Sequence, residues 1–375
     1  MRIVSLWFVL LLTVVLVLGG CTQTADTSNQ KNNADSQNKQ EGSEERTITD
    51  LAGNTVVIPS VDKINHVVIV APPLVSTYAS VVHDTSKLVG VSQVALSDAN
   101  PQILDRLVPN WKTINTTFLT GYASNTEELL KLDPDIILVY GSAQKEGLKN
   151  IKIPVVDFYI NKQVNETWSV EIDRLMREIF ALNDENSLQT EWNKANQKVA
   201  GVLEQAKGAP QQKGLMIMSN TGDKITVRGA GTYGDDWLLK SGLKNVAAEL
   251  KGENIEVTME QIFKWNPDIV YVFRGLPAAQ YLSGSIKGQD WSQVQAFKTA
   301  KIQDTPKGLM NWGTPCADSP LMIQWLVSKN YPDKFAEDEY KEIMKDYYSR
   351  CYGISLTDEL ITSILNPNQG KAVKR

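Results

Sequence analysis

The sequence is poor in histidine and in net charge, and each scarcity excludes a class of function. The 375 residues include two histidines, so a zinc or manganese site built from several histidines cannot form. A hard-cation site of carboxylates and tyrosines stays open, but no motif marks one. A net charge of −5 gives no electrostatic footprint for nucleic acid.

Catalytic motifs are also missing. We find no G-x-S-x-G, H-E-x-x-H or G-x4-G-K pattern in the chain, and few histidines leave general-base catalysis without its usual residue. We therefore expect neither an enzyme nor a bound metal or cofactor.

Long apolar runs are absent beyond the N-terminus. There, Arg2 precedes the run Leu6 to Leu18, which ends in Leu-Gly-Gly-Cys at Cys21. The run is shorter than the roughly 20 residues of a transmembrane helix and is typical of an export signal. Its end resembles a bacterial lipobox, which implies cleavage before Cys21 and a lipid on that cysteine. An ordinary secretion signal with a chance cysteine is the alternative.

The signal comprises residues 1–21, and the segment that follows it is polar. Residues 22–46 contain no aromatic or branched apolar residue, so they cannot bury enough surface to offset the entropy of ordering. We predict a flexible tether that holds the chain outside the cytoplasm at a membrane. About 330 residues remain, enough for two domains.

Cysteine is scarce as well, with three in the chain. Cys21 is assigned to the lipid, which leaves Cys316 and Cys351 in a compartment where thiols can oxidise. A disulfide between them would contribute on the order of 3 to 4 kcal/mol. Two isolated buried thiols are the equal alternative.

An internal repeat predicts the architecture. Residues 127–139 read EELLKLDPDIILV and residues 260–272 read EQIFKWNPDIVYV. Each copy predicts a short helix from its Glu, a stop at Pro134 or Pro267 because the ring cannot continue a helix, and a buried parallel strand. Two copies predict two α/β lobes of similar build.

Further strands and one helix complete this prediction. We expect strands at HVVIV from His66, LVGV from Leu88, DIILV from Asp135, VVDF from Val155, LMIM from Leu215, KITV from Lys224, DIVYV from Asp268 and near Ile302. Residues 185–207 carry a helical apolar stripe and would extend roughly 35 Å. We therefore predict an N-terminal lobe over 47–184, a connecting helix over 185–207, a C-terminal lobe over 208–367 and a tail over 368–375.

Several of these segments resemble one family. RTITDLAGNTVVIP from residue 46, both repeats, RGAGTYGDDWLLKSGLKNVA from residue 228 and PLMIQWLVSKNYPDKF from residue 320 are similar to the periplasmic-binding-protein family, which serves ABC importers of ferric siderophores, haem and vitamin B12. The likeness covers residues 46–365. It implies an α/β fold of two Rossmann-like lobes with mainly parallel sheets, joined by one long connecting helix, with the ligand between the lobes.

The glycines Gly229, Gly231 and Gly234 match the pattern G-x-G-x-x-G. A dinucleotide site would place pyrophosphate at the start of the following helix, but Asp235 and Asp236 would repel it there. We expect the glycines to allow a tight turn between strand and helix.

The two repeat glutamates are candidates for docking. In the resembled family, one exposed glutamate in each lobe contacts arginines of the permease, and Glu127 and Glu260 stand at the matching positions. Their structural role would be at helix starts, through a capping box from Ser124 to Glu127 and through the helix dipole two residues after Thr258. Both roles are compatible.

Ligand contacts are expected where loops leave the carboxyl ends of strands. The candidates are Tyr78, Tyr122, Tyr140, Arg228, Tyr233, Trp237, Arg274 and Trp312. Arg228 and Arg274 follow strands in matched places, and guanidinium groups beside aromatic faces suit an anionic chelate with a planar periphery.

The resemblance implies a monomeric, lipid-anchored substrate-binding protein. It would capture an iron chelate, with a ferric siderophore as the first candidate, and deliver it to an ABC permease dimer with its ATPase. Haem, a corrinoid or an oxyanion such as molybdate are alternative cargoes. A redox enzyme using the glycine loop and an extracytoplasmic sensor module are the rival functions.

Overall fold

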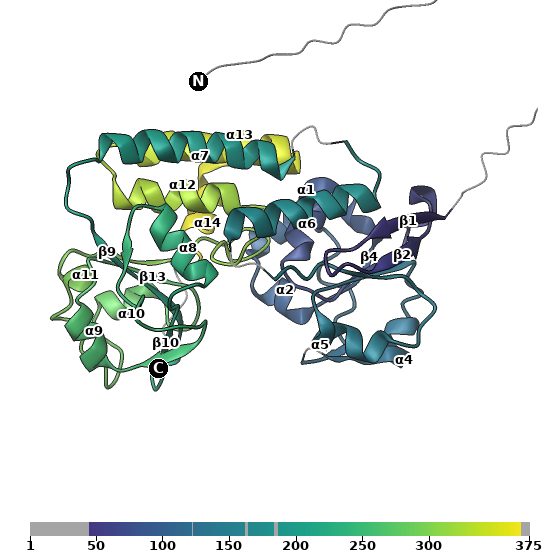
Figure 1. Cartoon of the computed structure of the whole chain (residues 1–375), viewed down its shortest axis with the longest axis horizontal. Coiled ribbons are helices and arrows are strands. Elements are labelled where there is room, and N and C mark those ends of the chain that lie inside the picture. The colour runs from purple at the N-terminus through teal and green to yellow at the C-terminus, as the bar shows by residue number, and fades with distance from the viewer. Residues whose placement is uncertain (1–44, 122, 162–163, 184–186, 369–375) are drawn as a thin grey trace, which may run out of the picture. The chain divides into compact units, whose positions relative to one another are not determined.

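Two β-sheets organise the chain (Figure 1). The computed structural model describes residues 45–121, 123–161, 164–183 and 187–368. The first sheet has strand order β4-β3-β7-β8, and all its pairings are parallel. Its strands are β3 Val67–Ile69, β4 Leu88–Val91, β7 Ile136–Val139 and β8 Val155–Asp157. All four strands predicted for the first lobe are confirmed.

The second sheet is mixed, with order β12-β10-β9-β13-β14 and β11 paired to β9. Its strands are β9 Lys213–Asn220, β10 Ile225–Val227, β11 Lys244–Asn245, β12 Ile255–Val257, β13 Ile269–Val272 and β14 Ile302–Asp304. The four predicted strands are β9, β10, β13 and β14. β10 runs antiparallel to β9 and β12, because a hairpin of a few residues connects β9 to β10 and cannot make a parallel crossover.

Helices cover both sheets, and two short hairpins lie outside them. The helices are α1 Leu74–Val81, α2 Gln93–Ser97, α3 Pro101–Leu107, α4 Thr126–Leu130, α5 Ser142–Lys145, α6 Asn165–Ile179, α7 Leu188–Gln205, α8 Tyr233–Lys240, α9 Met259–Trp265, α10 Ala278–Leu282, α11 Gln295–Lys298, α12 Ser319–Asn330, α13 Glu337–Tyr352 and α14 Asp358–Leu365. The 3-10 helices are Val61–Lys63, Thr85–Lys87 and Glu146–Leu148. The hairpins pair β1 Arg46–Thr49 with β2 Thr55–Ile58, and β5 Leu119–Thr120 with β6 Ala123–Ser124.

The repeat is reproduced in detail by α4-β7 and α9-β13. Each helix ends before a residue in the left-handed region, Asp133 with φ 48° and Asn266 with φ 43°, followed by the predicted proline. After it, the carboxylates of Asp135 and Asp268 accept hydrogen bonds from backbone N–H groups at the starts of β3 and β9, at 2.8 and 2.7 Å. The four residues 132–135 and their counterparts 265–268 therefore make the same connection from helix to strand in both halves.

Two long helices follow one another between the two sheets in the chain, where the sequence predicts one. The predicted helix over 185–207 is α7, whose apolar stripe is buried against α12. The preceding helix α6 was not expected. Its first residue Asn165 donates two hydrogen bonds of 2.9 Å to Asp236 of α8, and its last residue Ile179 accepts through its carbonyl from Arg46 of β1. It is α6 that contacts elements of both halves directly.

No helix among the residues described is long and apolar enough to cross a membrane.

Candidate functional site

A chain of aromatic rings runs from the end of β7 to a buried arginine after β10. Tyr140 follows β7, and its ring stacks on Trp168 of α6 with centroids 5.5 Å apart. Trp168 meets Tyr233 of α8 edge-on at 5.9 Å. The Arg228 guanidinium lies 4.0 Å over the Tyr233 ring. With Tyr159, whose ring contacts Tyr140 at 5.4 Å, we call these five residues the aromatic–arginine cluster.

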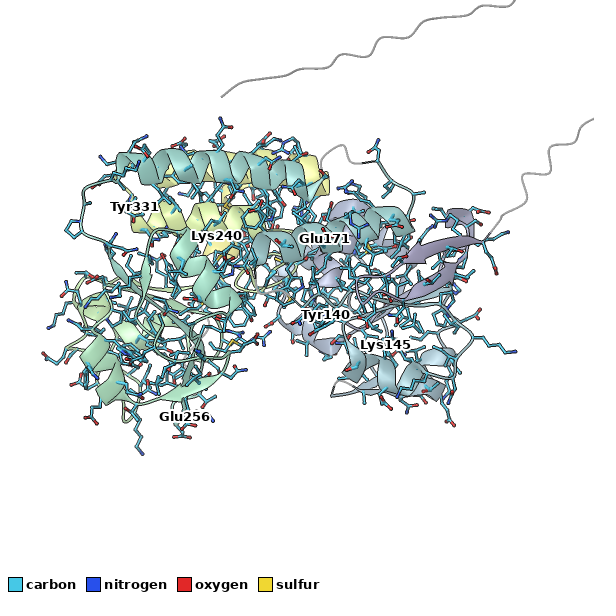
Figure 2. All side chains as sticks on the ribbon, in the orientation of Figure 1. Tyr140, Lys145, Glu171, Lys240, Glu256 and Tyr331 are labelled. Atoms are coloured by element: carbon cyan, nitrogen blue, oxygen red, sulfur yellow. The ribbon has the colours of Figure 1, made fainter. Side chains whose placement is uncertain are left out.

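The cluster draws on both halves of the chain. Tyr140 and Tyr159 follow strands of the first sheet, Arg228 follows a strand of the second, and α6 supplies Trp168 between them. Figure 2 labels Tyr140 next to α6, the helix that carries Glu171.

Arg228 is the most unusual member, because its side chain is 2 % exposed. Its Nη2 donates to the Tyr233 hydroxyl and, at 2.8 Å, to the Met218 sulfur. Nη1 lies 3.0 Å from Glu253 Oε2, yet neither Nη1 nor Nε has a hydrogen-bond partner among the described residues. Leaving a buried donor unpaired costs about 1 to 3 kcal/mol. Glu253 therefore balances the charge of the guanidinium, while two of its nitrogens still lack a hydrogen-bond acceptor within the described part of the chain.

Two tyrosines of the cluster, Tyr140 and Tyr233, have raised pKa values. Burial raises the pKa of Tyr140, and the nearby Glu253 carboxylate raises it further. Burial also raises the pKa of Tyr233, although Arg228 and Arg274 partly oppose this. Both hydroxyls consequently remain hydrogen-bond donors throughout the ordinary pH range.

Arg274 follows β13, as predicted, and its positive charge partly opposes the rise in the pKa of Tyr233. Its guanidinium lies 4.8 Å over the Phe273 ring, and Nη2 forms an ion pair with Asp98 at the end of α2. Lys307 Nζ lies 3.7 Å from the other Asp98 oxygen. A carboxylate from the first half of the chain thus forms an ion pair with the arginine that was predicted to bind the ligand.

The glycine loop is not shaped for pyrophosphate. Gly231 adopts φ 76°, which a turn into α8 requires. The Asp235 carboxylate accepts from the Gly231 N–H at 3.0 Å and from Asn245 at 2.9 Å. A protein carboxylate therefore already occupies the Gly231 N–H, and its charge would repel a phosphate there.

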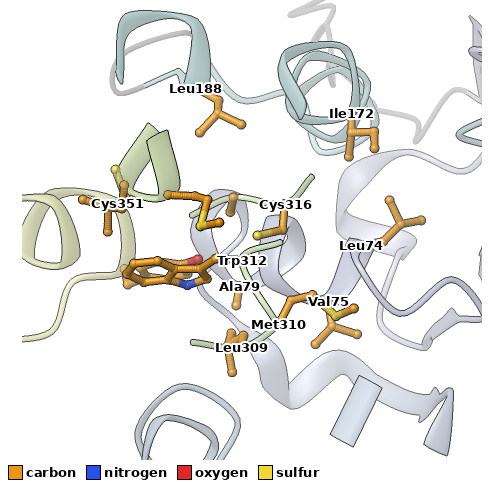
Figure 3. Packing of buried hydrophobic residues seen from close by; sticks show 14 of the residues in the cluster. Leu74, Val75, Ala79, Ile172, Leu188, Leu309, Met310, Trp312, Cys316 and Cys351 are labelled. Atoms are coloured by element: carbon orange, nitrogen blue, oxygen red, sulfur yellow. The ribbon is translucent and has the colours of Figure 1, made fainter. Parts of the chain in front are cut away.

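Three predicted ligand residues lie in the core instead. Tyr78 is inside α1, fully buried, with its hydroxyl donating to the Asp84 carbonyl at 3.1 Å. Trp237 is fully buried and donates to the Gly313 carbonyl at 3.0 Å. Trp312 is fully buried among the residues in Figure 3. Protein atoms enclose all three side chains, as they do Arg228 and Tyr233, so the role of these residues in ligand binding stays a prediction.

Two further predictions concern Tyr122 and Cys21, and both residues lie outside the part of the chain that the structure describes. The lipid signal and most of the tether lie outside it too. The disulfide prediction is resolved: Cys316 and Cys351 are free, buried thiols (Figure 3). Burial raises the pKa of both, that of Cys351 to about 12.

Sequence analysis missed Trp168, Tyr159, Glu253 and Asp98. Trp168 belongs to α6, which was not predicted. A possible helix start near Asn165 was the feature of the sequence that could have indicated this helix. Among the described residues, no group of three or more His, Cys, Asp or Glu side chains is arranged to hold a metal ion.

Glu127 and Glu260 are both exposed, and each is the second residue of its helix. Neither carboxylate forms an ion pair among the described residues. Thr258 caps α9 in a capping box with Gln261. The capping box predicted from Ser124 is wrong: Asn125 is the N-cap of α4 and accepts from the N–H groups of Glu127 and Glu128, because the hairpin β5-β6 holds Ser124 buried.

Comparison with known proteins agrees with this architecture. Residues 70–309 match the family model described as periplasmic binding protein. The chain is 26 % identical over 337 residues to the molybdate-binding protein MolA of Haemophilus influenzae, which covers 83 % of this chain and 92 % of that protein.

Solved structures of similar fold span nearly the same region. A periplasmic solute binding protein from Veillonella parvula has a TM-score of 0.75 at 27 % identity and covers 86 % of this chain and 97 % of its own. CeuE of Helicobacter pylori, solved with nickel and histidine, has a TM-score of 0.67 at 19 % identity and covers 86 % of this chain and 99 % of its own. This last likeness shows the fold alone.

Proposed function

Because this chain belongs to the periplasmic binding protein family that serves ABC importers of iron complexes, haem and related substrates, we propose that it binds an iron chelate, a ferric siderophore first among them, at the aromatic–arginine cluster. Members of this family are extracytoplasmic substrate-binding proteins rather than enzymes. The observation that carries the proposal is Arg228, a buried guanidinium with nitrogens that lack hydrogen-bond acceptors among the described residues, stacked on Tyr233 at one end of a row of aromatic rings.

The chemistry of the cluster favours an anionic ligand with flat faces. A guanidinium in a low-dielectric setting binds carboxylate or catecholate oxygens strongly and with directional hydrogen bonds. The rings of Tyr140 and Trp168 offer faces and edges to a planar periphery. An anionic ligand would also replace Asp98 as the partner of Arg274.

Molybdate is the second candidate, and the similarity to MolA favours it. A small oxyanion would use the unpaired Arg228 donors and the neutral Tyr140 and Tyr233 hydroxyls, and would make little use of the aromatic faces. The two candidates therefore differ in whether Trp168 is contacted.

A titration of the purified protein separates the cargoes. Tryptophan fluorescence is recorded while ferric catecholate and hydroxamate chelates, haem, a corrinoid and molybdate are added in turn. We expect a ferric chelate to quench Trp168 at micromolar concentration or below. Tighter binding of molybdate would establish the second candidate, and no binding by any of the five would overturn the proposal.

For delivery, we propose that the lipid on Cys21 holds the protein at the membrane and that Glu127 and Glu260 dock onto the permease. Each glutamate sits in the first turn of a helix that precedes a strand of its sheet, so the two occupy equivalent places. Widely separated carboxylates specify register on a two-fold partner.

The double variant Glu127→Ala with Glu260→Ala tests docking. We expect it to lose transport in whole cells while the purified protein keeps its ligand affinity. The matched control is Glu204→Ala with Glu342→Ala, two exposed glutamates that each pair with a lysine three residues later. Normal transport by the Glu127 and Glu260 variant would refute docking and favour a sensor role. Mass analysis of the mature N-terminus tests the lipid.

A further inference from the structure

We propose that the permease recognises two matched docking tips, each made of an unpaired acid and an exposed large apolar side chain beside it. The first tip is Glu127 with Leu130, and the second is Glu260 with Phe263. The inference rests on the proposed function, and it adds an apolar contact and a partner chemistry to the acidic one.

The observation is that exposed large hydrophobic side chains coincide with the repeat. Leu130 is 45 % exposed and Phe263 is 39 % exposed. Among the described residues, the other large hydrophobic side chains so exposed are Val57, Val94, Tyr159, Val164, Leu182 and Leu239. Single exposed hydrophobics are ordinary, but these two occupy the same position of the two repeat copies, each three residues after its glutamate.

The helix geometry places acid and apolar residue together. Residues three apart lie on the same face of a helix, so Leu130 shares a face with Glu127, and Phe263 with Glu260. The residue before each exposed apolar one, Leu129 in α4 and Ile262 in α9, is fully buried. That buried residue anchors each helix to its lobe and directs the neighbouring face toward solvent.

The first tip also borders a hollow. An open depression of about 560 Å³ lies beside Leu130 and is lined by Ile151, Ile153, Thr126 and Gly147 among others. Ile151 and Ile153 supply apolar surface to its lining, which also includes the charged residues Glu146, Lys149 and Lys152. A partner's aliphatic side chain would fit between the two isoleucines and Leu130.

The charges at the tips point to a cationic partner. Glu127 and Glu260 have no ion-pair partner among the described residues, whereas the adjacent Lys131 is already paired with Glu128 at 2.6 Å. The partner chemistry that fits is an arginine or lysine next to an aliphatic patch. A permease dimer presents such a half-site twice by its two-fold symmetry, which explains why both members of the tip recur in the two repeats.

The test uses the full chain with the reconstituted permease and its ATPase. The double variant Leu130→Ser with Phe263→Ser is compared with Val94→Ser with Leu239→Ser, two equally exposed hydrophobics outside the tips. The readout is the protein concentration that half-saturates ATPase stimulation. We expect the tip variant to need at least tenfold more protein and the control to stay within twofold of wild type.

Salt distinguishes the apolar contact from the acidic one. Charge contacts weaken with ionic strength, so added salt should weaken docking of wild type and bring it closer to the Glu127 and Glu260 variant. The Leu130 and Phe263 variant should still need more protein than wild type to half-saturate ATPase stimulation. A tip variant that behaves like the control overturns the inference, and so does an equal loss in both. Unchanged cargo binding and melting temperature in each variant exclude misfolding, with Leu130→Ala and Phe263→Ala as a milder second pair.

The outcomes also separate this inference from the proposed function. If cargo binding is absent from wild type, the proposed function fails. If the glutamate variant stimulates normally, acidic docking fails. If only the apolar variant stimulates normally, the apolar contact alone is wrong.

Discussion

At the residue scale, Asp318 is a buried acid outside the ligand cluster. Its side chain is fully buried at the start of α12, where Tyr352 donates to Oδ1 at 3.1 Å. A Cβ added at Gly308 would stand 2.6 Å from Oδ2 and 2.5 Å from the Tyr348 hydroxyl, so only glycine allows this approach. Burial raises the pKa of Asp318 from 3.8 to about 7.

This raised pKa predicts a pH-dependent stability. The folded state holds the proton more tightly than the unfolded state, so the contribution of Asp318 is fully present below pH 3.8 and is lost as the pH rises toward about 7. A pKa change of this size corresponds to about 4 kcal/mol at most. Asp318→Asn removes the charge and keeps the shape, so we expect it to stabilise the protein at pH 8 and to have little effect at pH 4.

Urea unfolding at both pH values measures this effect. The exposed Asp290→Asn variant, whose partner Ser292 is local, is the control. An equal effect of Asp318→Asn at pH 4 and pH 8 would show that the carboxyl does not titrate in this range.

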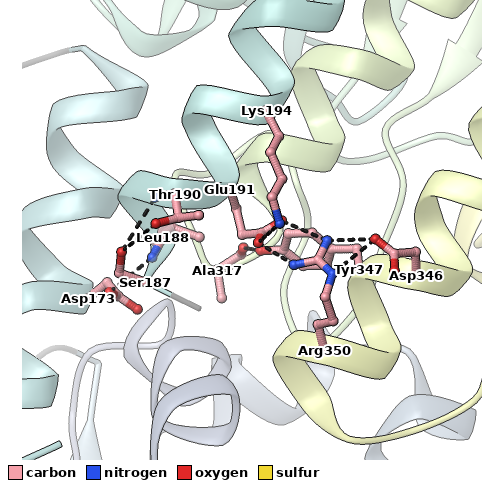
Figure 4. A network of polar contacts seen from close by, with 10 residues as sticks. All are labelled: Asp173, Ser187, Leu188, Thr190, Glu191, Lys194, Ala317, Asp346, Tyr347 and Arg350. Carbon is pink, nitrogen blue, oxygen red and sulfur yellow. Dashed lines mark hydrogen bonds and ion pairs between the residues drawn. The ribbon is translucent and has the colours of Figure 1, made fainter. Parts of the chain in front are cut away.

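At the element scale, a nearly buried ion pair ties α7 to α13. Glu191 of α7 is 3 % exposed and accepts from both terminal nitrogens of Arg350 of α13, with Nη2 at 3.0 Å (Figure 4). Lys194 and Asp346 complete the network. Because the carboxylate has little access to water, removing its bidentate partner leaves a poorly compensated charge.

Arg350→Met therefore should lower the free energy of unfolding by about 2 to 3 kcal/mol, less than a full loss because Lys194 remains. Arg174→Met, which removes only exposed pairs on α6, should cost under about 1 kcal/mol. Chemical denaturation of both variants is the measurement. Similar losses in the two would indicate that the pair between α7 and α13 contributes no more than a surface contact.

Sequence reasoning succeeded where local chemistry decides. Proline stops, β-branched runs and the helical stripe of α7 are read directly from neighbouring residues, so eight strands and that helix were predicted. It failed where tertiary contacts decide: α6 has many charged residues and no strong cap, and the pairing of β10 with β12 depends on a distant strand. For the candidate site, strand ends pointed to Tyr140, Arg228, Tyr233 and Arg274, whose roles in binding stay predictions. Strand ends could not show that Tyr78 lies on the buried face of α1 or that Trp312 is covered.

At the scale of the whole molecule, the two sheets share one hydrophobic core. Buried residues of β3, α1, α7, α8, β13, α12 and α13 form a single cluster, and the described residues fall within one compact unit. The two smaller clusters lie on the outer faces of the sheets. A shared core resists large rotation of one half against the other, so ligand capture should involve limited movement of the halves.

The central claim is that the aromatic–arginine cluster binds an anionic cargo through Arg228. Its most direct test is the dissociation constant of the tightest ligand from the fluorescence panel, measured by calorimetry for wild type, Arg228→Met and the surface control Arg174→Met. Loss of charge-assisted hydrogen bonds worth about 3 kcal/mol predicts that Arg228→Met binds the ligand roughly 100-fold more weakly than wild type. The control Arg174→Met should bind with wild-type affinity. Wild-type affinity in a folded Arg228→Met protein would contradict the account.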